Sequence, residues 1–173
     1  MSPTKVYTPA TRVGANRLPD GSWEFLLWAP LARAVILHLV RGREERILME
    51  SLADGYYRVT LNGLEAGSEY FYQLNSNRDL PDPASRFQPH GVHGSSQIFD
   101  PRAFRWTDHN WKGIELERAV FYELHVGTYT SEGTFDAVIG HLPELAALGI
   151  TTIELMPVAQ FPGSRNWGYD GVY

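Results

Sequence analysis

The last third of the chain has the pattern strand, helix, strand, and this pattern constrains the fold more than any other feature of the sequence. Residues 119–126 (AVFYELHV) and 150–156 (ITTIELM) are apolar runs with little alternation, as expected of strands covered on both faces. Between them, residues 135–145 carry apolar side chains at helical spacing. Such a βαβ unit makes a parallel sheet, but a single unit leaves apolar faces uncovered. We therefore expect this part to be incomplete, or to pack against the rest of the chain or against another chain.

The helix of this unit has clear end signals and one irregular position. Thr134 is an N-cap residue by type, Asp136 suits the positive end of the helix dipole, and Gly149 stands where a C′ glycine belongs. Pro143 lies inside the pattern, where a proline costs about 3 kcal/mol and removes a hydrogen bond. We expect a kink at Pro143, or two short helices.

The residues from Arg12 to Phe99 follow a different pattern of short strands separated by turn formers such as Asp54-Gly55 and Asn62-Gly63. The expected strands are residues 23–28, 34–40, 46–50, 56–61 and 69–74. In the last two strands one face reads Tyr57, Val59, Leu61 and Tyr70, Tyr72, Leu74. Strands at this spacing predict a β-sandwich, and hence an all-β domain followed by an incomplete α/β segment.

Two segments connect these patterns. Residues 81–94 hold three prolines and two glycines, which predicts an extended segment laid over the sandwich, and residues 95–99 would return as an edge strand. Residues 101–113 contain Trp106 and Trp111 among polar residues. We expect a linker there that docks through its two indoles.

Composition excludes several classes of protein. The net charge of −5 has no basic cluster of the kind that nucleic acids or anionic membranes require. The chain has no cysteine, and no histidine pair has helical metal-ligand spacing, so we expect neither a metal nor a cofactor. The polar N-terminus and the absence of a long apolar run lead us to expect a cytoplasmic protein.

Aromatic residues make up 13% of the chain, which allows two interpretations. Aromatic rings can stack on the apolar faces of sugars, and they also fill the cores of β-sandwiches. Trp28 is expected in the core and not at a ligand.

Several motifs of the last third resemble the α-amylase family of glycoside hydrolases. They are YELHVGTY (122–129), EGTF (132–135), ELMP (154–157) and WGYDGVY (167–173). Together they are most similar to the maltooligosyl trehalose trehalohydrolases, and glycogen branching and debranching enzymes share a looser version. WAP (28–30) and PDPASRFQPHGVHG (81–94) resemble the immunoglobulin-like domain that precedes the barrel in these enzymes, which is related to the family 48 carbohydrate-binding modules.

The resemblance implies three regions: an immunoglobulin-like sandwich (1–100), a linker (101–116) and the first βαβ portion of a (β/α)8 TIM barrel (117–173). It implies hydrolysis, with retention, of the α-1,4 bond that releases trehalose from maltooligosyl trehalose. The family's catalytic Asp, Glu and Asp follow later barrel strands, so no catalytic residue is assigned and this fragment is expected to be inactive. The alternatives are a branching or debranching enzyme, or a stand-alone glucan-binding module, and the uncovered βαβ faces allow self-association.

The resemblance also implies a substrate-binding site in the loop after the second barrel strand. Tyr169 would stack beneath a glucose ring, and Asp170 would pair with a basic residue of the remaining barrel. Trp167 and Asn166 would shape the same loop. His125 has two open roles, as a substrate-facing side chain or as a hydrogen-bonded structural histidine. Two further acids, Glu123 and Glu154, are expected to be structural, in an ion pair or a polar contact of the barrel core.

Overall fold

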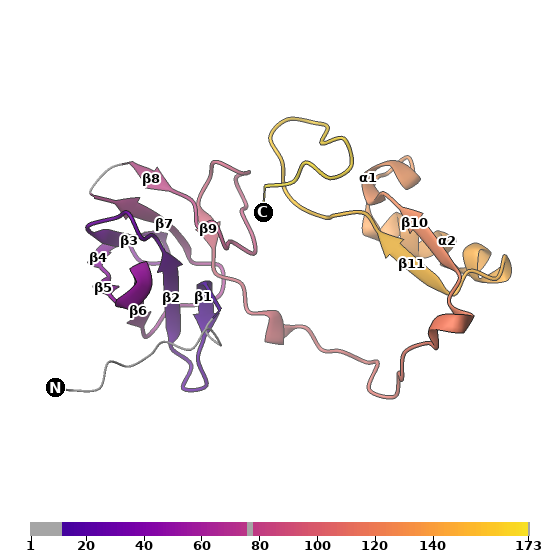
Figure 1. Cartoon of the computed structure of the whole chain (residues 1–173), viewed down its shortest axis with the longest axis horizontal. Coiled ribbons are helices and arrows are strands. Elements are labelled where there is room, and N and C mark those ends of the chain that lie inside the picture. Colours follow the sequence, from indigo (N-terminus) through magenta and orange to yellow (C-terminus); the bar gives the residue numbers. More distant parts are fainter. Residues whose placement is uncertain (1–11, 76–77, 173) are drawn as a thin grey trace. The chain divides into compact units, whose positions relative to one another are not determined.

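The structure is a computed structural model that describes residues 12–75 and 78–172. The chain divides into two compact units, one ending at Phe104 and the other spanning Arg105–Val172 (Figure 1). Each unit has its own sheet structure and its own apolar cluster, so each is considered by itself.

The first unit consists of two antiparallel sheets. One has the order β1-β2-β6-β5, and the other has the order β4-β3-β7-β8, with β9 also pairing with β7. The strands are β1 (Gly14–Arg17), β2 (Trp23–Trp28), β3 (Val35–Arg41), β4 (Glu45–Leu48), β5 (Glu50–Ser51), β6 (Tyr56–Leu61), β7 (Glu69–Leu74), β8 (Asp79–Leu80) and β9 (Ser96–Gln97). Two short 3-10 helices, η1 (Ala53–Gly55) and η2 (Pro101–Ala103), complete the unit.

The core lies between the two sheets. Phe25 and Tyr57 come from one sheet, Leu37 and Tyr70 come from the other, and all belong to one buried cluster. The edge of the Phe25 ring meets Tyr70 with 4.9 Å between ring centroids. Since the alternating residues of β6 and β7 point into this cluster as expected, the predicted sandwich is confirmed.

Two predictions for this unit are wrong. The run 46–50 is not one strand, because β4 pairs with β3 and β5 pairs with β6, in different sheets. The chain changes sheet at Met49, which is buried and donates its backbone N–H to Val35 O (2.9 Å). Trp28 is not in the core: its side chain is 57% exposed, because it ends β2 on the outward face of the sheet.

Residues 81–94 contain neither helix nor strand, and buried polar contacts attach the start of this segment to the sandwich. Asp82 is fully buried and accepts hydrogen bonds from Tyr70 Oη (2.6 Å) and Ala84 N (2.8 Å). Its backbone N–H donates to Ser96 Oγ (2.9 Å). Burial raises the pKa of the Asp82 carboxyl, although the hydrogen bond from Tyr70 acts in the opposite direction. The predicted return strand is seen as β9 on β7.

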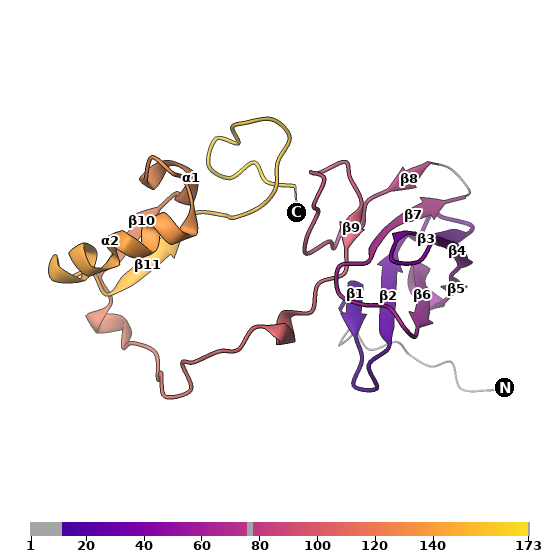
Figure 2. The ribbon, with the colours of Figure 1, turned by 180° about the vertical axis from the view of Figure 1, so that it is seen from behind.

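The second unit is a parallel βαβ arrangement. It contains η3 (Leu116–Arg118), β10 (Phe121–Leu124), α1 (Val126–Tyr129), α2 (Phe135–Ala147) and β11 (Thr152–Leu155). Strands β10 and β11 pair in parallel, with Leu124 beside Leu155 in the register. Helix α2 covers one face of this pair (Figure 2), where Leu124, Val126 and Val138 form a buried cluster.

The end signals of α2 are confirmed. Thr134 Oγ1 accepts a hydrogen bond from Ala137 N (3.3 Å), and Gly149 follows the helix with a positive φ of 92°. Asp136 lies in the first turn. Helix α2 continues through Pro143 as one helix, so the alternative of two short helices is wrong, and the kink stays a prediction.

The first strand of this unit is shorter than predicted. It ends at Leu124, and His125 and Val126, which the sequence pattern assigns to the strand, are the N-cap position and the first residue of the one-turn helix α1. Most of β10 is also exposed instead of covered on both faces, because among the described residues of this unit α2 covers one face of the sheet and no helix covers the other.

The indoles of the linker are largely exposed, at 63% for Trp106 and 73% for Trp111. Their docking stays a prediction. Within the described residues, none of the helices combines the length and hydropathy needed to cross a membrane.

Candidate functional site

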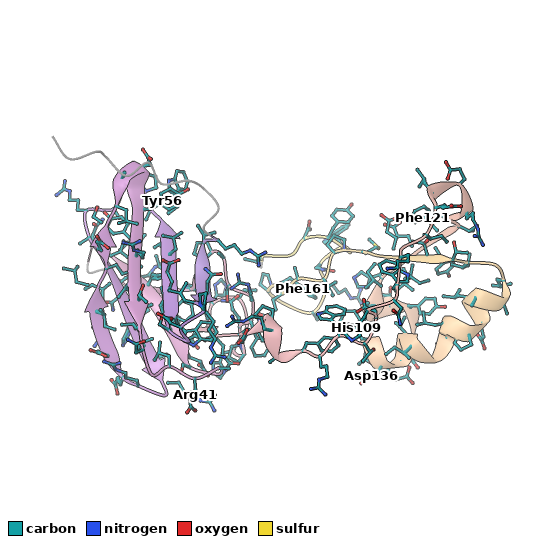
Figure 3. All side chains as sticks on the ribbon, turned by 90° about the horizontal axis from the view of Figure 1, so that it is seen from below. Arg41, Tyr56, His109, Phe121, Asp136 and Phe161 are labelled. Carbon is teal, nitrogen blue, oxygen red and sulfur yellow. The ribbon has the colours of Figure 1, made fainter. Side chains whose placement is uncertain are left out.

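A cleft of about 860 Å³ lies in the second unit at the carboxyl ends of β10 and β11. One wall consists of the residues that follow β10, from His125 to Thr128, and the residues that begin α2. The other wall is the segment after β11, including Met156, Phe161 and Trp167. Figure 3 shows the side chain of Phe161 on that segment. Carboxyl ends of parallel strands are common ligand sites, because loops from neighbouring strands converge there.

Asn166 organises the loop that bears most of the predicted site residues. It is buried, and its side-chain Oδ1 accepts a hydrogen bond from Gly168 N (3.0 Å). Its backbone carbonyl accepts two more, from Tyr169 N (3.2 Å) and Asp170 N (2.8 Å). These three hydrogen bonds join the backbone N–H groups of residues 168, 169 and 170 to Asn166. They are consistent with the expectation that Asn166 shapes this loop.

Gly168 allows this loop to close against the strand ends. Its φ is 96°, which side chains of L-residues rarely adopt. A Cβ atom at this position would lie 2.6 Å from Met156 Cε and 3.9 Å from His125 Cδ2. The loop therefore touches residues that follow both strands, which brings His125 and Trp167 to the same cleft.

His125 borders the cleft with an unsatisfied ring nitrogen. Its Nδ1 is buried and has no hydrogen-bond partner among the described residues. A structural histidine would ordinarily be held by such a bond. Both roles left open by the sequence stay predictions, because this nitrogen is buried and so is not presented to a ligand.

The predicted site residues do not all converge. Trp167 and His125 line the cleft, and the Trp167 side chain is 88% exposed and so available to a ligand. Tyr169 is 67% exposed and Asp170 is also exposed, but neither lines the cleft. Sequence reasoning did not single out Met156, Phe161 or Arg165, which do line it. Their position directly after the second strand was the available signal.

Glu123 and Glu154 do not form ion pairs with basic side chains of the described residues. They are register partners on adjacent strands and both are exposed. Paired residues share a face of the sheet, so the two carboxylates lie side by side on the face away from α2. Neither acid takes part in an ion pair of the described residues, so the alternative of an ion pair is wrong there, and the alternative of a polar contact in the barrel core stays a prediction. In this same part of the chain no group of metal-ligating side chains is placed to hold an ion.

Known proteins align with this chain across both of its units. Malto-oligosyltrehalose trehalohydrolase of Saccharolobus solfataricus is 50% identical over 158 residues, which is 91% of this chain and 28% of that protein. The 1,4-alpha-glucan branching enzyme GlgB of Photobacterium profundum is 29% identical over 196 residues, covering 99% of this chain and 27% of that protein. The chain thus spans about a quarter of the length of these curated relatives.

A solved structure agrees with both units. The crystal structure of a candidate alpha amylase from Salmonella typhimurium matches with a TM-score of 0.84 and 45% identity, covering 92% of this chain and 27% of that one. A sandwich followed by a parallel βαβ unit is therefore an arrangement that this chain shares with a structure of the alpha-amylase class.

Within this class, the first unit identifies the family. Residues 12–98, half of the chain, match carbohydrate-binding module 48 (isoamylase N-terminal domain). The chain belongs to the carbohydrate-binding module 48 family.

Proposed function

We propose that the chain is the N-terminal region of a retaining glycoside hydrolase that releases trehalose from maltooligosyl trehalose by cleaving an α-1,4 bond. The observation that carries the proposal is the 50% identity to a malto-oligosyltrehalose trehalohydrolase over 91% of the chain. The identity to a glycogen-branching relative is 29%, so trehalose release is favoured over branching. Debranching remains the other alternative of the same class.

The proposal includes the barrel. We assign residues 1–100 to an immunoglobulin-like sandwich, 101–116 to a linker and 117–173 to the first βαβ portion of a (β/α)8 barrel; residues 1–11, 76–77 and 173 of these ranges lie outside the described residues. The parallel pairing of β10 with β11 and the cleft at their carboxyl ends support this assignment, since TIM-barrel sites form at that end. Retaining hydrolysis needs a nucleophile and an acid/base carboxyl about 5–5.5 Å apart, and the resemblance places both on later strands. The chain by itself is therefore proposed to be inactive.

The cleft is proposed to form part of the sugar-binding surface of the whole enzyme. Trp167 offers an exposed ring face to a sugar, and the side chain of His125 lines the same cleft. Tyr169 and Asp170 are proposed to take part once later barrel strands cover this loop. Their exposure in this chain is compatible with that role.

A chimera tests the proposal. Residues 12–172 would replace the aligned stretch of the Saccharolobus trehalohydrolase, and the products from maltooligosyl trehalose would be separated by chromatography. Trehalose release by the chimera, with none from the chain alone, is expected. New or cleaved α-1,6 links would overturn the trehalohydrolase assignment, and hydrolysis by the chain alone would overturn its proposed inactivity. Trp167→Ala in the chimera should raise KM for the substrate, whereas Trp111→Ala serves as an exposed control outside the cleft.

A stand-alone glucan-binding module is the second candidate, favoured by the family match over residues 12–98. Apolar residues that the βαβ unit leaves exposed, such as Phe121, Phe135 and Ile139, would then serve self-association. Sedimentation velocity of the whole chain tests this part. A monomer at all concentrations would remove self-association from the proposal.

A further inference from the structure

A cavity in the first unit gathers arginine side chains that lie far apart in the sequence. Its volume is about 320 Å³, and it lies beside the hairpin of β1 and β2 (Figure 1), near the start of η2. The charged residues that line it are four arginines and two acids: Arg12, Arg17, Arg86, Arg102, Glu24 and Asp100. The lining therefore carries a formal excess of two positive charges, and we call it the arginine cavity.

Two of these arginines share a single carboxylate. Arg17 Nη1 donates to Asp100 Oδ2 (3.0 Å), and Arg102 Nε donates to Asp100 Oδ1 (3.0 Å). Hydrogen bonds from Arg102 and then Arg17 lower the pKa of Asp100 to about 2, so this acid is charged at neutral pH. The side chains of Arg17 and Arg102 are about half exposed, and each guanidinium group has further N–H donors. The shared carboxylate thus fixes both arginines and offsets only one of their two charges.

Arg86 is held in place by neutral groups. Its Nη1 donates to Ala15 O (2.6 Å), and its Nη2 donates to Asn16 Oδ1 (2.9 Å). Its charge also helps to lower the pKa of Asp82, but Asp82 is buried and does not line the cavity. Among the ion pairs of the described residues none involves Arg86. The guanidinium group is therefore oriented before any ligand arrives.

This arrangement favours an anion that carries two negative charges. Guanidinium groups brought together repel one another unless an anion offsets their charge, and a hollow lined by one sign of charge concentrates counter-ions. The planar fork of arginine matches the oxygens of phosphate and carboxylate groups. A phosphate monoester carries about −1.5 to −2 charges at pH 7, which matches the excess in the lining, whereas a monocarboxylate offsets only half of it.

We propose that the arginine cavity is a binding site for a small phosphate monoester, with Arg17, Arg86 and Arg102 donating hydrogen bonds to the phosphate oxygens. Small-molecule sites have volumes of roughly 300–1,000 Å³, so this cavity has room for an organic group beside the phosphate. A neighbouring hollow of about 360 Å³ shares Arg17 and Arg102 and extends that room. The proposal does not rest on the proposed function, since none of these residues lines the cleft of the second unit.

Nuclear magnetic resonance of the whole, unaltered chain tests the site directly. The arginine Nε–H signals can be assigned from single Arg→Lys variants. Titration with glucose 6-phosphate at about 0.15 M salt should shift the signals of Arg17, Arg86 and Arg102. The signal of Arg46, an exposed residue of β4 in the other sheet, should stay in place. The absence of shifts at millimolar glucose 6-phosphate overturns the proposal, as do equal shifts at Arg46, which would show attraction of the anion to any arginine.

Variants measured by calorimetry complete the test. Arg17→Gln and Arg86→Gln should each weaken binding of glucose 6-phosphate on the order of tenfold, because each removes a charge-assisted hydrogen bond. Arg86→Lys keeps the charge but loses the planar fork, so it should also bind more weakly than the wild type. Arg46→Gln makes the same change in net charge outside the cavity and should bind as the wild type. Unchanged affinity in Arg86→Gln overturns the proposal.

Three further probes define the ligand class. Inorganic phosphate should bind more weakly than glucose 6-phosphate, gluconate should bind more weakly still, and glucose should not bind. Gluconate binding as tightly as glucose 6-phosphate would overturn the phosphate assignment, and inorganic phosphate binding as tightly would overturn the ester. A chimera that releases no trehalose would overturn the proposed function and leave this site unaffected.

Discussion

Replacing Asp82 with alanine should destabilise the sandwich by about 2–3 kcal/mol. The carboxylate accepts hydrogen bonds from Tyr70 Oη (2.6 Å) and Ala84 N (2.8 Å), and both donors lose their partner in the variant. The Tyr70 hydroxyl is buried in the core, where an unsatisfied donor costs about 1–3 kcal/mol. Ala84 is only partly buried, so water recovers much of its bond and adds about 1 kcal/mol or less. Removing a buried carboxyl whose pKa is raised by burial offsets a part of this loss.

Urea unfolding of the whole chain, followed by tryptophan fluorescence, measures the effect, with Asp108→Ala in the linker as an exposed control. A double-mutant cycle with Tyr70→Phe should give a coupling of about 1–2 kcal/mol, since both changes remove the same hydrogen bond. The difference between wild type and Asp82→Ala should narrow as the pH rises above about 4, because a raised native pKa favours the protonated state. A loss below about 0.5 kcal/mol, or strictly additive effects, would refute the reasoning.

Three further predictions concern other parts of the chain. The pKa of Asp100 is lowered to about 2 by hydrogen bonds from Arg102 and then Arg17, so its stabilisation of about 1–2 kcal/mol should be lost as the pH falls from about 4 to 2. Asp100→Asn should flatten acid unfolding curves in that window, and an unchanged curve would contradict this. Thr134→Ala removes the N-cap of α2 and should cost about 1 kcal/mol, measured by thermal unfolding at 222 nm against Thr107→Ala at an exposed position of the linker. Gly168→Ala should move the loop away from Met156, and an unchanged Met156 methyl resonance would argue against it.

The sandwich could be predicted where alternation and turn formers agree. The strands 56–61 and 69–74 were expected with the boundaries that β6 and β7 have, because each alternates between the core and the outer side. The division of residues 46–50 between two sheets was not predictable, since the run contains no glycine or proline that would signal a break. The division depends on pairing of β4 with β3 and of β5 with β6, and the local sequence pattern does not show which strands pair.

The candidate site was predicted in part. The motif of residues 167–173 predicts a loop at the strand ends, and the structure places Trp167 and His125 together there. The extension of the first strand to Val126 was wrong, because an apolar residue that is buried under a helix looks the same in sequence as one in a strand. The roles of Tyr169 and Asp170 and the cytoplasmic location stay predictions.

The change of sheet at Met49 has a consequence for how the sandwich unfolds. A single residue separates β4 from β5, so the chain has no slack between the two sheets. Separating the sheets would have to break the Met49 contact and detach one of these strands, so neither sheet can be lost while the other stays whole. Amide hydrogen exchange should therefore report one opening free energy for β3 and β6, although they belong to different sheets. One inserted residue at this point would also turn β5 over and exchange its outward and inward faces.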